Sequence, residues 1–130
     1  MSKVLVVDDS RTIRTIIRRI LIGIGYEVCE ADNGVEALKV LEVERDAVTL
    51  VLADWNMPEM NGLELLKQLR QDPNFASLKI IMVTTETEMD HMASALEAGA
   101  NEYIMKPFTK DILVEKLDYV GFSSMAKAEA

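Results

Sequence analysis

Two hydrophobic patterns alternate along the chain, and this alternation limits the possible folds more than any other feature. Short, continuous apolar runs are typical of strands buried on both faces of a sheet. Between them, apolar residues recur every three or four positions, which is typical of amphipathic helices. The expected strands are 4–7, 26–31, 48–53, 79–84 and 102–105, and the expected helical stripes are 13–24, 35–41, 63–69, 89–96 and 112–120. The pattern predicts an α/β fold, with a doubly wound five-stranded parallel sheet flanked by five helices.

Nothing in the sequence divides the chain into separate units. Its 130 residues are the length of one ordinary domain. No internal repeat, linker or low-complexity stretch interrupts the alternating pattern. We therefore expect one domain over residues 1–121. Residues 122–130 have no convincing apolar face, so we expect a disordered C-terminal tail there.

Composition and charge exclude several classes of function. Hydrophobic residues make up 49% of the chain and charged residues 28%, a balance typical of globular proteins. The net charge of −8 argues against binding to nucleic acid or anionic membranes, and no uncharged run approaches the roughly 18 residues that span a bilayer. The single Cys29 and the single His91 cannot build an internal disulfide or a Cys/His zinc site. We expect a cytoplasmic protein without membrane insertion.

Polar side chains gather at the carboxyl ends of the expected strands. Asp8 and Asp9 follow the first strand and Asp54 follows the third. Thr84 ends the fourth strand, and Lys106 follows the fifth. These ends share one edge of a parallel sheet, where such folds bind their ligands. Three carboxylates brought together repel one another unless a cation neutralises them, and oxygen ligands of this kind suit Mg²⁺.

The same residue types favour phosphoryl-transfer chemistry. A carboxylate can attack a phosphoryl donor and form an acyl phosphate. The charge of the phosphoryl group is then balanced by the metal ion, by the ammonium of Lys106 and by the hydroxyl of Thr84. Each residue alone has an ordinary structural explanation, such as a helix cap for the aspartate pair or a solvated charge for Lys106. Their coincidence at one sheet edge favours the phosphoryl-transfer interpretation.

Four motifs, in this order, identify a resemblance to a known family. They are VLVVDDS at 4–10, LADWNMPEMNG at 52–62, IIMVTTE at 80–86 and GANEYIMKPF at 99–108. Over about residues 3–121 the chain resembles the receiver domains of bacterial two-component response regulators, and in particular the stand-alone regulators of chemotaxis. The resemblance implies the flavodoxin-like fold of those domains.

The resemblance also assigns roles to the aspartates. Asp54 would be the phosphoacceptor. Asp9 and Asp54 would bind Mg²⁺ directly, together with the backbone carbonyl of Asn56. Asp8 would hold a metal-bound water.

Further roles concern the phosphoryl group and the response to it. Thr84 and Lys106 would contact the phosphoryl oxygens, and the Lys106–Pro107 bond would be cis. Tyr103 occupies the aromatic switch position and would turn inward when Thr84 moves towards the phosphoryl group. The surface formed by the fourth helix, the fifth strand and the fifth helix would then change shape.

Two positions in the motifs bear on the lifetime of the phosphoryl group. Asn56 and Glu86, two residues after Asp54 and Thr84, match the chemotaxis pattern, in which these sites influence the attack of water on the acyl phosphate. Short-lived signalling is therefore expected. Thr85 departs from the pattern, since a smaller alanine commonly follows the threonine, and a bulkier side chain could hinder access of water or of the phosphodonor.

The function implied by the resemblance is a phosphorylation-activated signalling switch. A histidine kinase of the chemotaxis type would phosphorylate Asp54, and a protein target, the flagellar motor switch above all, would bind the changed surface. The chain would not be an enzyme in the usual sense, because it catalyses only its own phosphorylation and dephosphorylation. A phosphatase is a further candidate partner, and we expect a monomer. A phosphorelay intermediate, a phosphate sink and a receiver excised from a longer regulator stay open, because the catalytic motif does not encode the partner surface.

Three other interpretations fit the sequence less well. A haloacid-dehalogenase-type phosphatase also uses an Asp nucleophile and Mg²⁺, but it needs a second Asp where this chain has Asn56. A flavodoxin-like electron carrier would need a Ser/Thr/Gly-rich phosphate loop after the first strand, where this chain has the acidic stretch DDSRT. The intact set of Asp9, Asp54, Thr84 and Lys106 disfavours a receiver that acts only as a scaffold.

Overall fold

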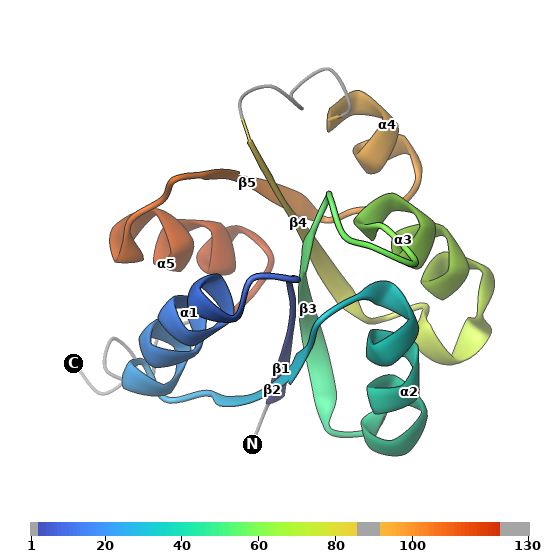
Figure 1. The fold of residues 1–130 in the computed structure, drawn as a ribbon, viewed down its shortest axis with the longest axis horizontal. Coiled ribbons are helices and arrows are strands. Elements are labelled where there is room, and N and C mark those ends of the chain that lie inside the picture. Colours follow the sequence, from blue (N-terminus) through green and yellow to red (C-terminus); the bar gives the residue numbers. More distant parts are fainter. Residues whose placement is uncertain (1–2, 86–91, 123–130) are drawn as a thin grey trace.

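The computed structural model describes residues 3–85 and 92–122. It contains a five-stranded parallel sheet with strand order β2-β1-β3-β4-β5, and helices pack against both of its faces (Figure 1). The predicted fold class is confirmed. In chain order the elements are β1 (Lys3–Val7), α1 (Arg11–Gly23), β2 (Glu27–Ala31), α2 (Gly34–Glu44), β3 (Val48–Asp54), α3 (Gly62–Gln71), the 3₁₀ turn η1 (Pro73–Phe75), β4 (Lys79–Thr85), α4 (Met92–Glu97), β5 (Glu102–Lys106) and α5 (Lys110–Tyr119).

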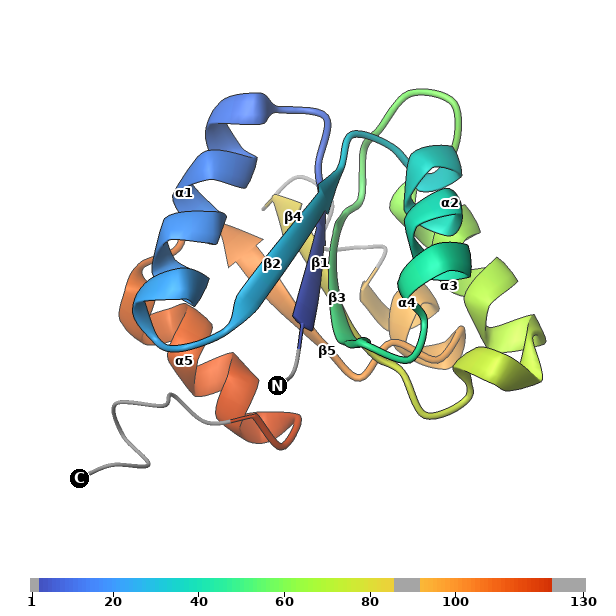
Figure 2. The same ribbon diagram turned by 90° about the horizontal axis from the view of Figure 1, so that it is seen from below.

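The helices form one layer on each face of the sheet. Figure 2 shows α1 and α5 on one face and α2, α3 and α4 on the other. From β1 the chain first adds β2 on one side, and then β3, β4 and β5 on the other side. Because the crossovers are right-handed, α1, which connects β1 to β2, lies on one face of the sheet, and α2, α3 and α4, which connect β2 through β5, lie on the other. The carboxyl ends of β1 and β3 therefore lie where the order reverses, which is where open α/β sheets bind ligands. Among the described residues no helix is both long and apolar enough to cross a membrane.

Hydrophobic side chains fill both interfaces between the sheet and its helices. Val4 and Val6 of β1 pack on the α1 and α5 side, together with Ile17. Leu5 and Val7 of the same strand pack on the side of α2 and α3. Neighbouring strand residues point to opposite faces, so a sheet covered on both sides needs apolar residues at successive positions. This arrangement explains the continuous apolar runs that predicted the strands.

The buried faces of four helices are narrower than the periodicity predicted. Ile16 of α1, Val35 of α2, Leu96 of α4 and Ile112 of α5 belong to the predicted stripes, but their exposed fractions are 47%, 38%, 46% and 40%. The neighbouring side chains Ile17 and Ala95 are buried instead. Successive helix residues are rotated by about 100°, so a residue beside the line of contact with the sheet turns to solvent. The prediction was wrong for these four side chains.

Some predictions concern residues outside the described ranges. Met89 of the predicted fourth stripe, His91 and Glu86 lie there. The same is true of the predicted tail over 122–130, of which only residue 122 is described. The division of the chain into a domain over 1–121 and a tail stays a prediction.

Capping side chains fix the start of the helices that follow β1, β2, β3 and β5. Each accepts a hydrogen bond from the backbone N–H three residues later, and they are Ser10, Asn33, Asn61 and Thr109. At α3 the Glu64 side chain also accepts from the N–H of Asn61, which completes a capping box. The capped helix ends lie at the same sheet edge as Asp8 and Asp54. The caps therefore define the short loops that carry the polar residues.

Gly62, the first residue of α3, lets that helix approach the end of β3. Its N–H donates to the carbonyl oxygen of Trp55 at 3.0 Å. A Cβ at this position would collide with the carbonyl oxygen of Asp54 and would lie 2.7 Å from Cε of Met82. Only glycine fits here without moving the backbone that carries Asp54.

Gly62→Ala should destabilise the fold, because the new methyl group meets backbone rather than the end of a flexible side chain. Overpacking of this kind costs about 1–3 kcal/mol. Gly23→Ala is the matched control: a Cβ at this last residue of α1 has nothing within 4 Å, and the change should stabilise by about 0.4–1 kcal/mol. Urea denaturation measures both effects. A Gly62→Ala midpoint equal to that of the unaltered protein would show that α3 shifts at no cost.

Candidate functional site

Three carboxylates lie together at the carboxyl edge of the sheet. The strands β1 and β3 are neighbours with Val7 opposite Ala53, so Asp8 and Asp54 come from adjacent strand ends. Asp8, Asp9 and Asp54 each offer a carboxylate oxygen, and these oxygens all lie within 4.8 Å of one another. Asp8 and Asp54 are buried, whereas Asp9 is exposed. The predicted grouping of these three residues is confirmed.

Lys106 brings a positive charge to the carboxylates from the far side of the sheet. It ends β5, which β4 separates from β3, and the long side chain spans this distance. Its Nζ lies 2.9 Å from Oδ2 of Asp8 and 3.2 Å from Oδ1 of Asp54. Hydrogen bonds between charged groups are stronger than neutral ones, so this contact offsets part of the repulsion among the carboxylates. The Lys106–Pro107 bond is cis, as predicted.

Burial and charge shift the titration of both partners. Burial raises the pKa of Asp54, the negative charge of Asp8 raises it further, and Lys106 partly offsets both effects, which gives a net pKa of about 6. Burial alone would lower the pKa of Lys106, but its contacts with Asp8 and Asp54 outweigh burial, and the net pKa is raised. Lys106 is therefore charged at neutral pH, and Asp54 is ionised there despite its raised pKa.

Three donors hold Asp8 in place. The N–H of Ser10 donates to Oδ1 of Asp8 at 2.8 Å, while Lys106 binds Oδ2. Nη1 of Arg14 donates to the carbonyl oxygen of Asp8 at 2.6 Å. No motif in the sequence marks this role of Arg14, and it was not predicted. Gly62 was missed as well, although it ends the motif that contains Asp54.

Thr84 and Tyr103 lie on one face of the sheet, on neighbouring strands. Thr84 is buried, and its Oγ1 lies 3.4 Å from the carbonyl oxygen of Thr85. In the pairing of β4 with β5, Met82 is opposite Tyr103 and Thr84 is opposite Met105. Alternate residues of a strand share a face, so Met82 and Thr84 point to the same face. Tyr103, which is opposite Met82, therefore lies on that face diagonally next to Thr84. This neighbourhood is compatible with the predicted switch.

Lys116 of α5 contacts Tyr103, which the sequence analysis did not predict. Its Nζ lies 4.5 Å from the centre of the Tyr103 ring and 3.4 Å from Oε1 of Glu102. An ammonium over an aromatic face is attracted by the ring. The salt bridge with Glu102 keeps the ammonium near that face. Lys116 thus stabilises the observed position of Tyr103.

The residues predicted to tune dephosphorylation are Asn56 and Glu86. Asn56 lies in the loop after β3 and is exposed. It follows Trp55, which is buried and whose backbone N–H donates to the carbonyl oxygen of Val83 at 3.0 Å. The loop is therefore tied to β4 next to Asp54. Glu86 lies outside the described residues.

The raised pKa of Asp54 predicts a pH-dependent stability in the absence of divalent cations. Folding raises the pKa of this carboxyl from 3.8 to about 6, so the folded state binds the proton more tightly than the unfolded state. The stabilising contribution is complete below about pH 4 and is lost as the pH rises through about 6. Asp54→Asn should remove this loss and be the more stable protein at neutral pH. Urea denaturation across this range tests it, and parallel pH profiles for the two proteins would contradict the raised pKa.

Comparison with known proteins shows the family. Residues 4–118 match the family described as "Response regulator receiver domain", and the chain belongs to this family. The chemotaxis protein CheY1 of Helicobacter pylori is 52% identical over 119 residues, which cover 91% of this chain and 95% of that protein. The CheY homolog of Campylobacter jejuni is 50% identical over 119 residues, 91% of each chain. The protein is therefore a CheY-like receiver of two-component signalling, a signalling protein rather than a classical enzyme.

Solved structures agree with this assignment. The chemotaxis protein CheY4 of Vibrio cholerae has a TM-score of 0.85 and is 37% identical, covering 92% of this chain and 98% of that one. The receiver domain of the sensor histidine kinase PA1611 from Pseudomonas aeruginosa has a TM-score of 0.80 and 26% identity, covering 92% and 98%. That structure has a magnesium ion coordinated in the active-site cleft.

Proposed function

We propose that Asp54 is the phosphoacceptor of a phosphorylation-activated switch. The observation that carries this proposal is the place of its carboxylate, which is buried, grouped with those of Asp8 and Asp9, and 3.2 Å from the ammonium of Lys106. A nucleophilic carboxylate, acidic metal ligands and a fixed ammonium group thus lie together at the carboxyl edge of the sheet. Such an arrangement stabilises the charge that develops during phosphoryl transfer.

Mg²⁺ is the cofactor of this proposal. Carboxylate oxygens within 4.8 Å of one another are suited to a hard cation. Asp9 and Asp54 would bind it directly with the backbone carbonyl of Asn56, and Asp8 would bind it through a water. When bound, the ion neutralises the carboxylates and offers a coordination position to a phosphoryl oxygen. The magnesium in the similar receiver of P. aeruginosa supports this choice.

The transfer step joins Asp54 to phosphorus. One carboxylate oxygen attacks the phosphorus of a phosphohistidine, the P–N bond breaks, and the imidazole nitrogen keeps the electron pair and takes a proton from water. A pKa of about 6 leaves Asp54 ionised for this attack at neutral pH. Lys106 and Thr84 hold the phosphoryl oxygens. Water later attacks the acyl phosphate and releases inorganic phosphate, at a rate that Asn56 and Glu86 tune.

The response passes from Thr84 to Tyr103 and so to the surface of α4, β5 and α5. The proposed phosphodonor is a histidine kinase of the chemotaxis type, and the proposed target is a flagellar motor switch protein, with a phosphatase as a further partner. Identities of 50–52% with proteins named for chemotaxis support these partners. A monomer in the cytoplasm is part of the same proposal.

Asp54→Asn should abolish phosphorylation by acetyl phosphate and Mg²⁺, because the amide has no anionic oxygen to attack phosphorus. Intact-mass spectrometry measures the adduct. Trp55, the neighbour of Asp54, gives a second readout, since its fluorescence should change with Mg²⁺ and again with acetyl phosphate only when Asp54 is present. Asp46→Asn, at an exposed position, is the matched control and should behave as the unaltered protein. Stoichiometric labelling of Asp54→Asn would sink the proposal.

Lys116→Met should raise the population of the inward Tyr103 position before phosphorylation. The substitution removes the ring contact that stabilises the Tyr103 position observed in the structure. A cation–π contact of about 0.5–1 kcal/mol corresponds to a change of about two- to fivefold in this equilibrium. Ring resonances of Tyr103 in NMR spectra, compared with those of the phosphorylated protein, measure it. Lys67→Met, at an exposed position of α3, is the control. Identical Tyr103 resonances in both variants would show that Lys116 does not bias the switch.

A further inference from the structure

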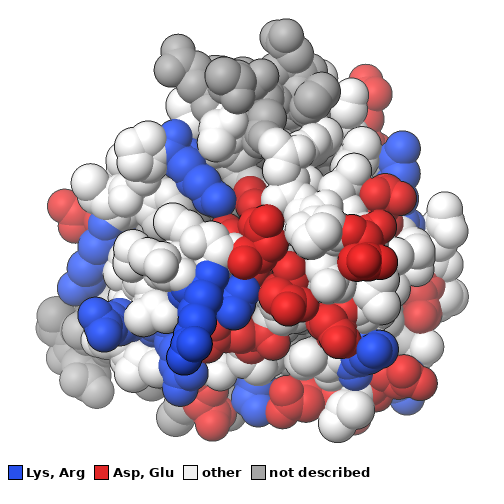
Figure 3. All heavy atoms as spheres, viewed as in Figure 1, with Lys and Arg blue, Asp and Glu red and all other residues white. Residues whose placement is uncertain are grey.

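Helix α1 carries a cluster of positive charge that the proposed switch does not use. Four of the six arginines of the chain lie on it, Arg11, Arg14, Arg18 and Arg19, and the helix contains no acidic residue. The helices α2, α3 and α5 each contain acidic and basic residues. In a chain of net charge −8 this concentration stands out, and Figure 3 shows blue side chains gathered over α1 beside a band of carboxylates.

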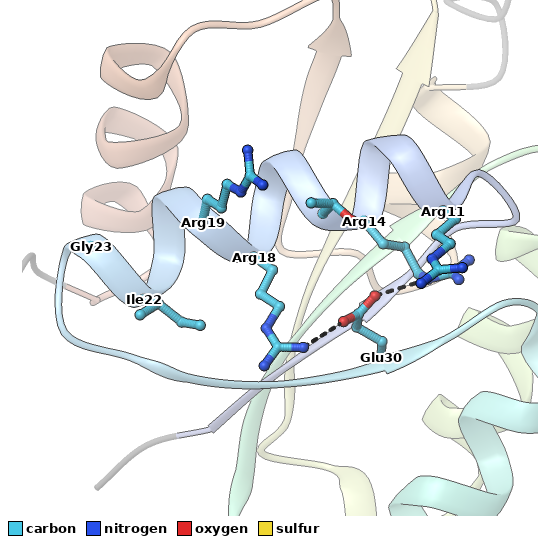
Figure 4. A pocket seen from close by; sticks show the side chains of 8 residues that line it. Arg11, Arg14, Arg18, Arg19, Ile22, Gly23 and Glu30 are labelled. Carbon is cyan, nitrogen blue, oxygen red and sulfur yellow. Dashed lines mark hydrogen bonds and ion pairs between the residues drawn. The ribbon is translucent and has the colours of Figure 1, made fainter.

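These arginines line an open hollow at the β2 edge of the sheet. Its lining includes Arg11, Arg14, Thr15, Arg18, Ile22 and Glu30, and its volume is about 500 Å³. Figure 4 shows Arg11, Arg14 and Arg18 on the side of α1 that faces Glu30, and Arg19 on the other side. Residues 11, 14 and 18 are spaced by three and four positions, so they form one stripe along the helix. We call this stripe, together with Ile22, the α1 basic surface.

Most of the positive charge on the α1 basic surface is not neutralised within the described part of the chain. Glu30 is the acidic partner, with Oε1 3.0 Å from Nε of Arg14 and Oε2 3.1 Å from Nη1 of Arg18. Arg11 makes no ion pair with a described residue. As the first residue of α1 it also sits where the helix dipole disfavours a cation. Helix stability therefore does not account for an arginine at this position.

An apolar side chain lies within the same surface. Ile22 is 51% exposed and lies one turn beyond Arg18, on the same side of the helix (Figure 4). The exposed isoleucine offers a hydrophobic contact, and the guanidinium groups beside it offer bidentate hydrogen-bond donors. Such a combination fits a folded protein segment better than a bare anion.

We propose that the α1 basic surface binds an acidic helical segment of a partner protein, with carboxylates one and two turns apart and an apolar side chain against Ile22. Arg11 and Arg18 are seven residues apart, about 10 Å along the helix, which matches glutamates two turns apart on a partner helix. Guanidinium groups bind carboxylates in a planar, bidentate geometry. A long polyanion fits less well, because it would extend over the neighbouring carboxylates (Figure 3).

This interaction is separate from the proposed response to phosphorylation. The α1 basic surface lies at the β2 edge, and β5 is the opposite edge of the sheet. A partner on α1 therefore leaves the surface of α4, β5 and α5 free. Binding does not require a phosphoryl group on Asp54, so its test is independent of the proposed function.

The test measures binding of a fluorescein-labelled, alanine-rich peptide with glutamates at positions i, i+3 and i+7 and one leucine, by fluorescence polarisation. The full chain is used without a phosphodonor, and again as Asp54→Asn. We expect saturable binding that Arg11→Gln with Arg18→Gln weakens about tenfold or more. Arg45→Gln with Lys67→Gln removes the same charge from exposed positions elsewhere and should weaken binding less than twofold. Arg14 is left unchanged because it holds Asp8.

Equal weakening by the two double variants would overturn the proposal, because net charge alone would then explain binding. Tighter binding of a DNA duplex than of the peptide to the same arginines would overturn it as well. NMR of the unaltered protein keeps the test valid if a variant unfolds: the peptide should shift the amide resonances of α1 and β2 and leave those of α5 unchanged. Shifts confined to α5, or none at saturating peptide, would contradict the assignment.

Discussion

The mutual repulsion of carboxylates at one sheet edge is the constraint on which the site depends. Parallel strands bring Asp8 and Asp54 together whatever their side chains prefer, and burial makes their like charges more costly. The ammonium of Lys106 offsets part of this repulsion, although Lys106 ends a strand that is two positions from β3 in the sheet. The fold therefore has to hold β5 in register with β3 through β4. The sheet, the cap at Ser10 and the close approach of Gly62 all serve this geometry.

Fold class and the grouping of acidic residues followed from the sequence because each rests on a simple rule. Continuous apolar runs indicate strands covered on both faces, and the carboxyl ends of parallel strands share an edge. The exposure of Ile16 and Leu96 did not follow, because periodicity gives the angle between residues but not which sector of the helix faces the sheet. Contacts made through backbone atoms, such as Arg14 with the Asp8 carbonyl, leave no pattern in the sequence. The ring contact of Lys116 depends on the tertiary placement of α5.

The family of the protein and the roles of its single residues rest on different kinds of observation. The family is shown by the match over 4–118 and by relatives at 50–52% identity, and this excludes the phosphatase and electron-carrier interpretations. The roles of single residues are proposals that rest on geometry. For Asp54 that geometry includes burial, the grouped carboxylates and the ammonium at 3.2 Å. For Thr84 and Tyr103 it is a shared sheet face, which places them as neighbours.

Arg14 joins two regions that otherwise look independent. Its Nη1 holds the carbonyl oxygen of Asp8 at the acidic edge, while its Nε holds Glu30 beside the basic stripe of α1. A ligand that drew Glu30 away would change the restraint on Asp8, and a ligand at the aspartates would change the availability of Arg14. Thermodynamic linkage makes such an effect reciprocal, so each ligand would alter the affinity for the other by the same factor. One guanidinium group thus contacts both the acidic edge and the α1 basic surface.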